Sequence, residues 1–149
     1  MFLSKTCIYG IRAVLYTATL EKDKYVPIST IAKELGISFH FLTKILQTLT
    51  QKQLMHSYRG PNGGIALAKP AATMKLVDIV EAIDGTKLFT DCLLGLPGCG
   101  KRKPCPLHDS WSDVRHQIYN MLTQTTVADL AKKFQSEGLR LSDLEDLAS

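Results

Sequence analysis

The sequence predicts a mainly α-helical fold with a small β-hairpin wing: a winged helix-turn-helix domain followed by a long dimerisation helix. Two short helical segments flank the tight turn at 35–38, and two apolar runs then flank the turn-forming segment 59–64. A helical hairpin followed by a β-hairpin is typical of a winged helix. The long helix is predicted over 107–123, where apolar residues recur at helical spacing around Trp111.

The first helix is expected over residues 5–20, with an inward stripe formed by Ile8, Ile11, Leu15 and Ala18. Cys7 lies beside this stripe and is interpreted as a small core residue. Ser29 can cap the second helix, which Gly36 ends.

Ser38 can cap a third helix, whose predicted inward positions are Leu42, Ile45, Leu46 and Leu49. The opposite face is polar and cationic, and consists of His40, Thr43, Lys44, Gln47 and Thr48. Such a face can enter a major groove and donate hydrogen bonds to base edges and phosphates. The alternative is a purely structural helical hairpin.

Two strands are expected over 54–58 and 65–68, joined by a tip that contains Arg59, Gly60, Pro61, Asn62 and Gly63. Glycines would let backbone amides approach phosphates, and Arg59 could reach a phosphate or a narrow minor groove. An ordinary surface hairpin is the alternative. The tip lacks the Gly-Lys-Ser/Thr run of a phosphate-binding loop, which argues against nucleotide hydrolysis.

Charge is distributed unevenly along the 149 residues. Residues 1–70 hold nine Lys or Arg against three acidic residues, giving +6, whereas residues 71–149 hold nine against eleven, giving −2. The first half therefore has the charge of a polyanion-binding domain, although a solvated basic face would look the same. No apolar run reaches the ~18 residues of a membrane span, so we expect a cytoplasmic protein with reduced cysteines and no membrane partner.

A further helix over 76–83 is expected to complete a DNA-binding domain of residues 1–86. A cysteine-rich loop would follow over 87–109, and a dimerisation helix with a C-terminal segment over 110–149. The helical stripe in this last part consists of Trp111, Val114, Ile118, Met121 and Leu122. Since little chain remains to cover it, we expect it to pack against the same helix of a second subunit, the alternative being its own domain.

The loop places Cys92, Cys99, Cys105 and His108 in a segment rich in glycine and proline. No regular element is expected there, and a loop can turn such side chains toward a common centre. Thiolates suit zinc, copper(I) or iron–sulfur clusters, and an imidazole can replace one of them.

Other interpretations of this loop stay open. The cysteines could be free thiols, or one disulfide and a spare thiol, and His108 could be a helix residue without a metal. The four residues could also form a structural zinc site, or two cysteines could act as a metal-free redox switch. An enzyme is not expected, because no grouping of nucleophile and base avoids the candidate ligands.

The tip sequence RGPNGG, the Cys-x-x-His ending of the loop and the Trp-bearing helix after it together resemble one family. They are similar to the bacterial winged-helix iron–sulfur regulators typified by the cluster-assembly repressor IscR and the nitric-oxide sensor NsrR. The resemblance covers residues 1 to about 135. It implies a homodimeric transcription factor, usually a repressor, that binds operator DNA.

The resemblance also implies that Cys92, Cys99 and Cys105 bind an iron–sulfur cluster whose state sets the affinity for DNA. His108 matches the fourth ligand of the 2Fe–2S cluster in IscR, whereas Ile8 occupies the place of the carboxylate ligand in NsrR. The gap between the first two cysteines is one residue longer than in IscR. Residues in DNA-contacting places are Ser38, His40, Thr43 and Arg59, although the side chains at 40 and 43 differ from those of IscR.

Overall fold

The computed structural model describes residues 2–20, 22, 24–100 and 102–142. In chain order the elements are α1 (Lys5–Ala18), α2 (Ile28–Leu35), α3 (Phe39–Gln51), β1 (Met55–Tyr58), β2 (Gly64–Leu67), a 3-10 turn (Ala71–Thr73), α4 (Leu76–Asp84), α5 (Lys87–Thr90), α6 (His108–Gln124) and α7 (Val127–Glu137). The predicted mainly α fold with a hairpin wing is confirmed. The short helix α5 and the 3-10 turn were not predicted, and the end of the expected C-terminal segment, 143–149, lies outside the described residues.

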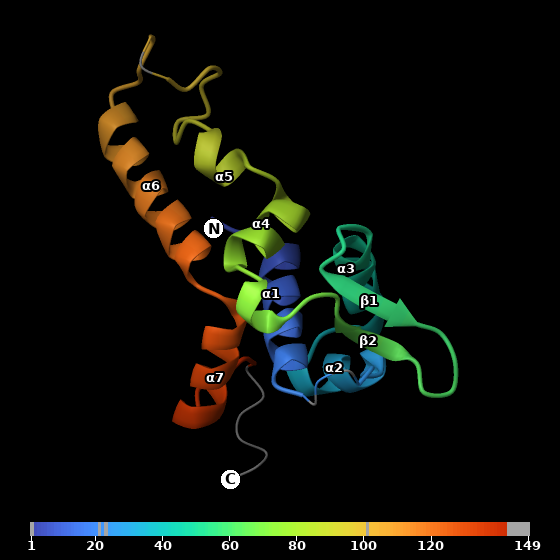
Figure 1. Cartoon of the computed structure of the whole chain (residues 1–149). Helices are drawn as coiled ribbons and strands as arrows, with labels where there is room; N and C mark the ends of the chain where they lie inside the picture. Colours follow the sequence, from blue (N-terminus) through green and yellow to red (C-terminus); the bar gives the residue numbers. More distant parts are fainter. Residues whose placement is uncertain (1, 21, 23, 101, 143–149) are drawn as a thin grey trace.

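Helix α1 is the centre of the molecule, because α2, α3, α4 and α7 all pack against it (Figure 1). Its predicted inward stripe was partly wrong. Leu15 is buried, but Ile8, Ile11 and Ala18 are only half-buried, whereas the fully covered face consists of Cys7, Gly10, Ala13, Val14 and Thr17. Small residues lie inward because neighbouring helices approach α1 closely on several sides. The interpretation of Cys7 as a core residue is confirmed, since its side chain is fully buried.

Of the two helix caps predicted around the turn between α2 and α3, the cap of α3 is confirmed and the cap of α2 is wrong. The Ser38 side chain accepts a hydrogen bond from the Phe41 amide and caps α3, as predicted. Ser29 does not cap α2, because the helix already begins at Ile28 with Pro27 as its N-cap. Gly36 ends α2 in the left-handed conformation, with a φ of 64°. A glycine adopts this conformation without steric strain, which explains the tight turn.

The hairpin is antiparallel and pairs Met55 with Leu67 and Tyr58 with Gly64. Its second strand is also fixed to the segment before α2, because Val26 and Ile65 exchange both backbone hydrogen bonds, at 2.9 and 2.8 Å. At Gly64 the chain passes so close to the Val26 carbonyl that a Cβ atom would overlap it. The wing is therefore anchored to the domain at its base.

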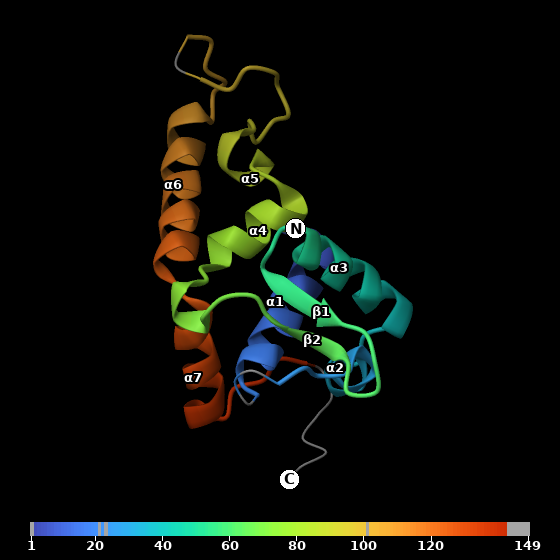
Figure 2. The same cartoon turned by 45° about the vertical axis from the view of Figure 1, so that its right-hand side comes forward.

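Helices α6 and α7 lie on the side opposite the hairpin, where α7 packs against α1 and α6 extends away from the domain (Figures 1 and 2). At their junction the Leu76 amide donates to the Thr125 carbonyl at 3.1 Å, and the Val127 amide donates to the Met74 carbonyl at 2.8 Å. Only part of the apolar stripe predicted for α6 is buried within this chain. Trp111 and Leu122 are buried, whereas Val114 is 42% and Met121 57% exposed. None of the described helices is both long and apolar enough to cross a bilayer.

Candidate functional site

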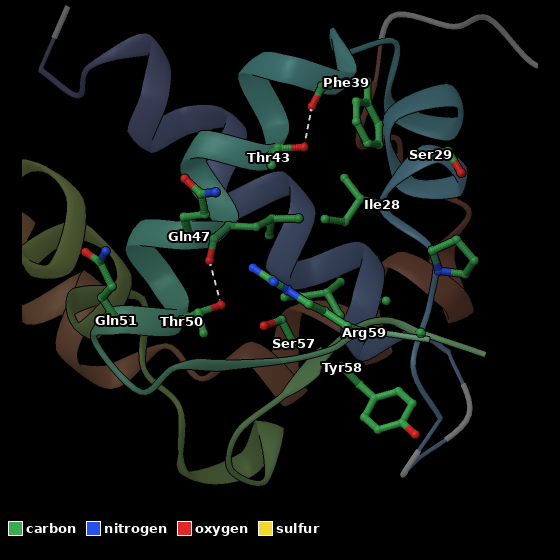
Figure 3. A pocket seen from close by; sticks show the side chains of 15 residues that line it. Ile28, Ser29, Phe39, Thr43, Gln47, Thr50, Gln51, Ser57, Tyr58 and Arg59 are labelled. Carbon is green, nitrogen blue, oxygen red and sulfur yellow. Dashed lines mark hydrogen bonds between the residues drawn. The ribbon is translucent and has the colours of Figure 1, made fainter. Parts of the chain in front are cut away.

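A groove of about 710 Å³ lies between α3 and the hairpin. Helix α3 contributes Phe39, Thr43 and Gln47, and the hairpin contributes Tyr58 and Arg59 (Figure 3). The Arg59 side chain extends from the hairpin toward α3 in this view. The groove joins the two elements that the sequence assigns to DNA binding.

The DNA-binding residues expected on α3 lie on its outer surface. Ser38, His40, Lys44 and Gln47 are exposed, and Thr43 is half-buried. The Thr43 hydroxyl donates a hydrogen bond to the Phe39 carbonyl at 2.8 Å, so its proton is already used within the helix. The predicted outer face is therefore present, but Thr43 does not offer a free hydroxyl donor.

The hairpin tip also uses part of its hydrogen-bonding capacity internally. Arg59, Gly60, Pro61 and Asn62 are exposed. The Gly63 amide, however, donates to the Gly60 carbonyl at 2.9 Å, and a Cβ atom at Gly63 would collide with the Tyr58 carbonyl. Gly63 is thus explained by the closure of the turn, and its amide is not directed to a phosphate.

Phe39 is a groove residue that the sequence reasoning missed. This residue is 48% exposed at the first position of α3. It precedes Thr43 by four residues, and residues four apart share a helix face. That spacing could have placed Phe39 with the polar face, but an aromatic side chain among polar residues was not considered a DNA contact.

The cysteine loop brings the four predicted ligands together as two pairs. The sulfurs of Cys92 and Cys105 lie 3.6 Å apart, and the Cys99 sulfur lies 3.6 Å from Nδ1 of His108. All three cysteines are free thiols. No set of three His, Cys, Asp or Glu side chains in the described part of the chain is grouped closely enough to bind one metal ion. The Cys99 side chain also hydrogen-bonds to that of Cys92, so the loop brings all four candidate side chains close to one another. That these side chains bind a metal stays a prediction.

Helix α6 holds this loop by side chains that were not predicted. Nε1 of Trp111 and one Nη of Arg115 donate to the Asp91 carbonyl, at 2.9 and 3.1 Å. The same Arg115 nitrogen lies 3.7 Å from the Cys99 sulfur. Since Asp91 directly precedes Cys92, these contacts fix the start of the loop and its second cysteine to one face of α6.

The two cysteines of the first pair differ in acidity. Backbone amides of Leu96 and Leu94 hydrogen-bond to the Cys92 sulfur and lower the pKa of its thiol. Burial raises the pKa of the Cys105 thiol, and the neighbouring Cys92 adds to this effect. Cys92 therefore loses its proton first, and a thiolate is the form that binds metals and reacts with oxidants.

Comparisons with known proteins assign the chain to a family. Residues 3–133 match the Rrf2 model, which is described as an iron-dependent transcriptional regulator. The chain belongs to the Rrf2 family. This membership confirms the resemblance to IscR-type regulators that the sequence motifs indicated, and the Rrf2 relatives are regulators rather than enzymes.

Two relatives align with this chain over most of their length. An HTH-type transcriptional regulator of Aquifex aeolicus is 33% identical over 132 residues, which cover 87% of this chain and 91% of the relative. The regulator IscR of Yersinia pseudotuberculosis is 32% identical over 122 residues, which cover 82% of this chain and 74% of the relative.

Solved structures of the Rrf2 type share the fold. The structure of T. potens IscR has a TM-score of 0.74 at 24% identity and covers 93% of this chain and 91% of its own. The structure of CymR, the global cysteine regulator of B. subtilis, has a TM-score of 0.73 at 22% identity, with coverage of 87% and 95%. These two structures therefore show that the fold of this chain is shared by IscR and CymR.

Proposed function

We propose that this Rrf2 protein is a homodimeric, DNA-binding transcriptional repressor whose affinity for its operator is controlled by a 2Fe–2S cluster. The cluster ligands are Cys92, Cys99, Cys105 and His108. The proposal keeps the division into a DNA-binding domain (1–86), a cluster-binding loop (87–109) and a dimerisation segment (110–149). It also assigns the protein to the cytoplasm, where thiols stay reduced.

The pairing of the ligands is the observation that carries this proposal. Two sulfurs bound to one tetrahedral metal at about 2.3 Å lie about 3.7 Å apart, and a sulfur and an imidazole nitrogen lie slightly closer. Both pairs in the loop have a separation of 3.6 Å. A two-iron cluster needs two protein ligands on each iron, whereas a single zinc ion needs all four ligands around one centre. The two close pairs therefore suit the two irons of a 2Fe–2S cluster, and metal analysis distinguishes this cluster from a single zinc ion held by the same residues.

The donor set also suits the charge of such a cluster. A bound 2Fe–2S cluster supplies a core charge of about +2, so three thiolates and a neutral imidazole leave the site near −1. The Arg115 guanidinium beside Cys99 opposes this negative charge. Most described residues between Cys92 and Cys105 are exposed, so without the metal this segment is ordered by the α6 contacts and by a few hydrogen bonds within the loop.

The loop can influence DNA binding through α6, which follows it directly. Val114 and Met121 of α6 are exposed and apolar, so we assign this surface to the second subunit. A change at the start of α6 then alters how the two recognition helices α3 are spaced, and operator half-sites require a fixed spacing. A coupling of about 1–3 kcal/mol would change operator affinity about 5- to 150-fold.

The test begins with anaerobic reconstitution of the full chain. We expect visible absorption bands and two irons and two sulfides per chain, with Cys92→Ala, Cys99→Ala, Cys105→Ala and His108→Ala each losing them. Cys7→Ala is the matched control, because Cys7 is a buried core residue outside the loop. Operator titrations of the loaded and metal-free protein then measure the coupling. A colourless protein with one zinc per chain, or equal operator affinity with and without iron, would refute the cluster switch.

One observation also favours a second candidate, a metal-free thiol switch. The sulfurs of Cys92 and Cys105 are close enough to form a disulfide after small movements. With a peroxide as two-electron oxidant, one thiol would become a sulfenic acid and release the reduced peroxide, and the second thiol would then displace water. Treatment of metal-free protein with hydrogen peroxide and mass analysis tests this. A reversible loss of two hydrogens that changes operator affinity in the wild type, but not in Cys105→Ser, would support it.

A further inference from the structure

The first turn of α3 carries an apolar patch where the sequence indicated hydrogen-bond donors. Phe39 is 48% exposed and lines the groove with Thr43 and Ile28 (Figure 3). The ring of His40 contacts the Phe39 ring edge-on, with 5.7 Å between the ring centroids. An aromatic side chain left in water on a helix that faces a ligand is favoured to contact an apolar group of that ligand.

The hydrogen bonding of Thr43 makes the same surface more apolar. Its hydroxyl proton is donated to the Phe39 carbonyl at 2.8 Å, so the helix backbone satisfies its capacity as a donor. The remaining branch of this side chain is a methyl group. Phe39 and Thr43 are four residues apart and therefore lie on one face of the helix.

We propose that Phe39 and the Thr43 methyl group form a contact for the 5-methyl group of a thymine in the major groove, and that this contact sets part of the operator sequence. The inference rests on the proposed DNA-binding function. Of the four bases, only thymine presents a methyl group in the major groove, and Phe and Thr methyl groups are side chains that contact it. The position also fits, because residues at the N-terminal end of a recognition helix reach the base edges.

The experiment uses duplexes selected from a random library by the full-length wild-type protein. Each thymine in the selected half-site is replaced in turn by uracil, which lacks the methyl group but keeps every hydrogen-bonding atom. In each half-site we expect one thymine whose replacement by uracil weakens wild-type binding about 4-fold. This is the change in affinity expected when one buried methyl-sized group is removed from the interface. Phe39→Ala should bind the thymine and uracil duplexes equally well, whereas Phe39→Leu should keep part of the preference.

A matched pair of variants at position 43 separates the methyl group from the hydroxyl group. Thr43→Val keeps the methyl group and should retain the thymine preference. Thr43→Ser keeps the hydroxyl group and should lose part of that preference. Both side chains are close in size to threonine, and circular dichroism and thermal unfolding verify that each variant is folded.

The outcomes distinguish this inference from the proposed function. If the wild type binds a selected site but no thymine-to-uracil replacement weakens it, or if Phe39→Ala keeps the full preference, the methyl contact is refuted while DNA binding stands. The opposite pattern at position 43, with loss in Thr43→Val and retention in Thr43→Ser, also refutes it and assigns the hydroxyl to base recognition. Failure to bind any duplex at low salt would overturn both.

Discussion

Cys7 differs in environment from the three loop cysteines. It is fully buried in a small cluster with Val77, Val80 and Leu122. Burial, together with the carboxylate of Asp84, raises the pKa of the Cys7 thiol to about 12. The thiol therefore stays protonated at neutral pH, and it should resist alkylation and oxidation while the protein is folded.

This raised pKa predicts how stability depends on pH. Above the ordinary thiol value of 9.0 the unfolded Cys7 ionises, whereas the folded one keeps its proton up to about 12. Rising pH in this window therefore favours the unfolded state, with a slope from this group that approaches about 1.4 kcal/mol per pH unit only well above pH 9. The free energy of unfolding, measured with urea at several pH values between 8 and 10.5, should fall with pH in both proteins. The fall should be less steep in Cys7→Ala than in the wild type by the contribution of this thiol. Parallel declines in the two proteins would contradict the assignment.

Helix α6 connects the cysteine loop to the rest of the molecule. Its Trp111 and Arg115 side chains both donate to the Asp91 carbonyl, and Arg115 also contacts the Cys99 sulfur. Between these points most side chains are exposed, and the other contacts are hydrogen bonds within the loop, such as those of the Leu94 and Leu96 amides to the Cys92 sulfur. The ordering of the loop should therefore depend strongly on α6.

We expect Arg115→Ala to loosen the loop without unfolding the protein. Loss of the charged hydrogen bonds should speed amide hydrogen exchange over 92–105 by about tenfold, while exchange in α1 stays the same. Arg102→Ala is the control, because it removes the same charge from an exposed side chain of the same loop. Hydrogen-exchange mass spectrometry on metal-free protein makes the measurement. Equal exchange in the two variants would mean that Arg115 does not order the loop.

The exposed apolar face of α6 gives a second prediction for this element. Met121→Glu places a charge on the face that we assign to the subunit interface, where it would be desolvated without a partner. The dimer dissociation constant should rise on the order of 10- to 100-fold. Asn120→Glu adds the same charge to a neighbouring exposed position on the side of α6 away from Trp111. Sedimentation equilibrium that finds both variants equally dimeric would assign the interface elsewhere.

The whole molecule separates a basic half from an acidic one. Residues 1–70 carry +6 and residues 71–149 carry −2. The basic half includes α3 and the hairpin, which form the groove, whereas the acidic half includes α6 and α7. We expect this separation to favour the approach of DNA to the half of the chain that contains α3 and the hairpin.

Salt dependence tests this charge distribution. Operator affinity should fall steeply with salt, and Lys44→Gln should reduce the slope of log K against log salt by about 1 for each Lys44 in contact with a phosphate. Lys133→Gln, which removes the same charge from an exposed position on α7, should leave the slope unchanged. A similar change of slope in both variants would mean that net charge alone, rather than the α3 face, determines binding.

The sequence by itself determined most of the elements and pointed to the four candidate ligands. The helices and the hairpin follow from local patterns, such as the Ser38 cap, the Gly36 stop and the turn residues between β1 and β2. The family also follows from local motifs, because the tip, the cysteine spacing and the tryptophan position are read along the chain. Such features depend on residues a few positions apart, so they can be recognised without a structure.

Only the tertiary structure decided which side chains contact one another and which hydrogen-bond donors already have a partner within the protein. It placed the small face of α1 inward, since the surrounding helices pack closely there. It brought the four candidate ligands together as two close pairs and tied the loop to Arg115 of α6. It also directed the Thr43 hydroxyl to the helix backbone and left Phe39 exposed. These outcomes depend on distances between residues far apart in the chain or on the choice of a side-chain rotamer, and neither is encoded in a local pattern.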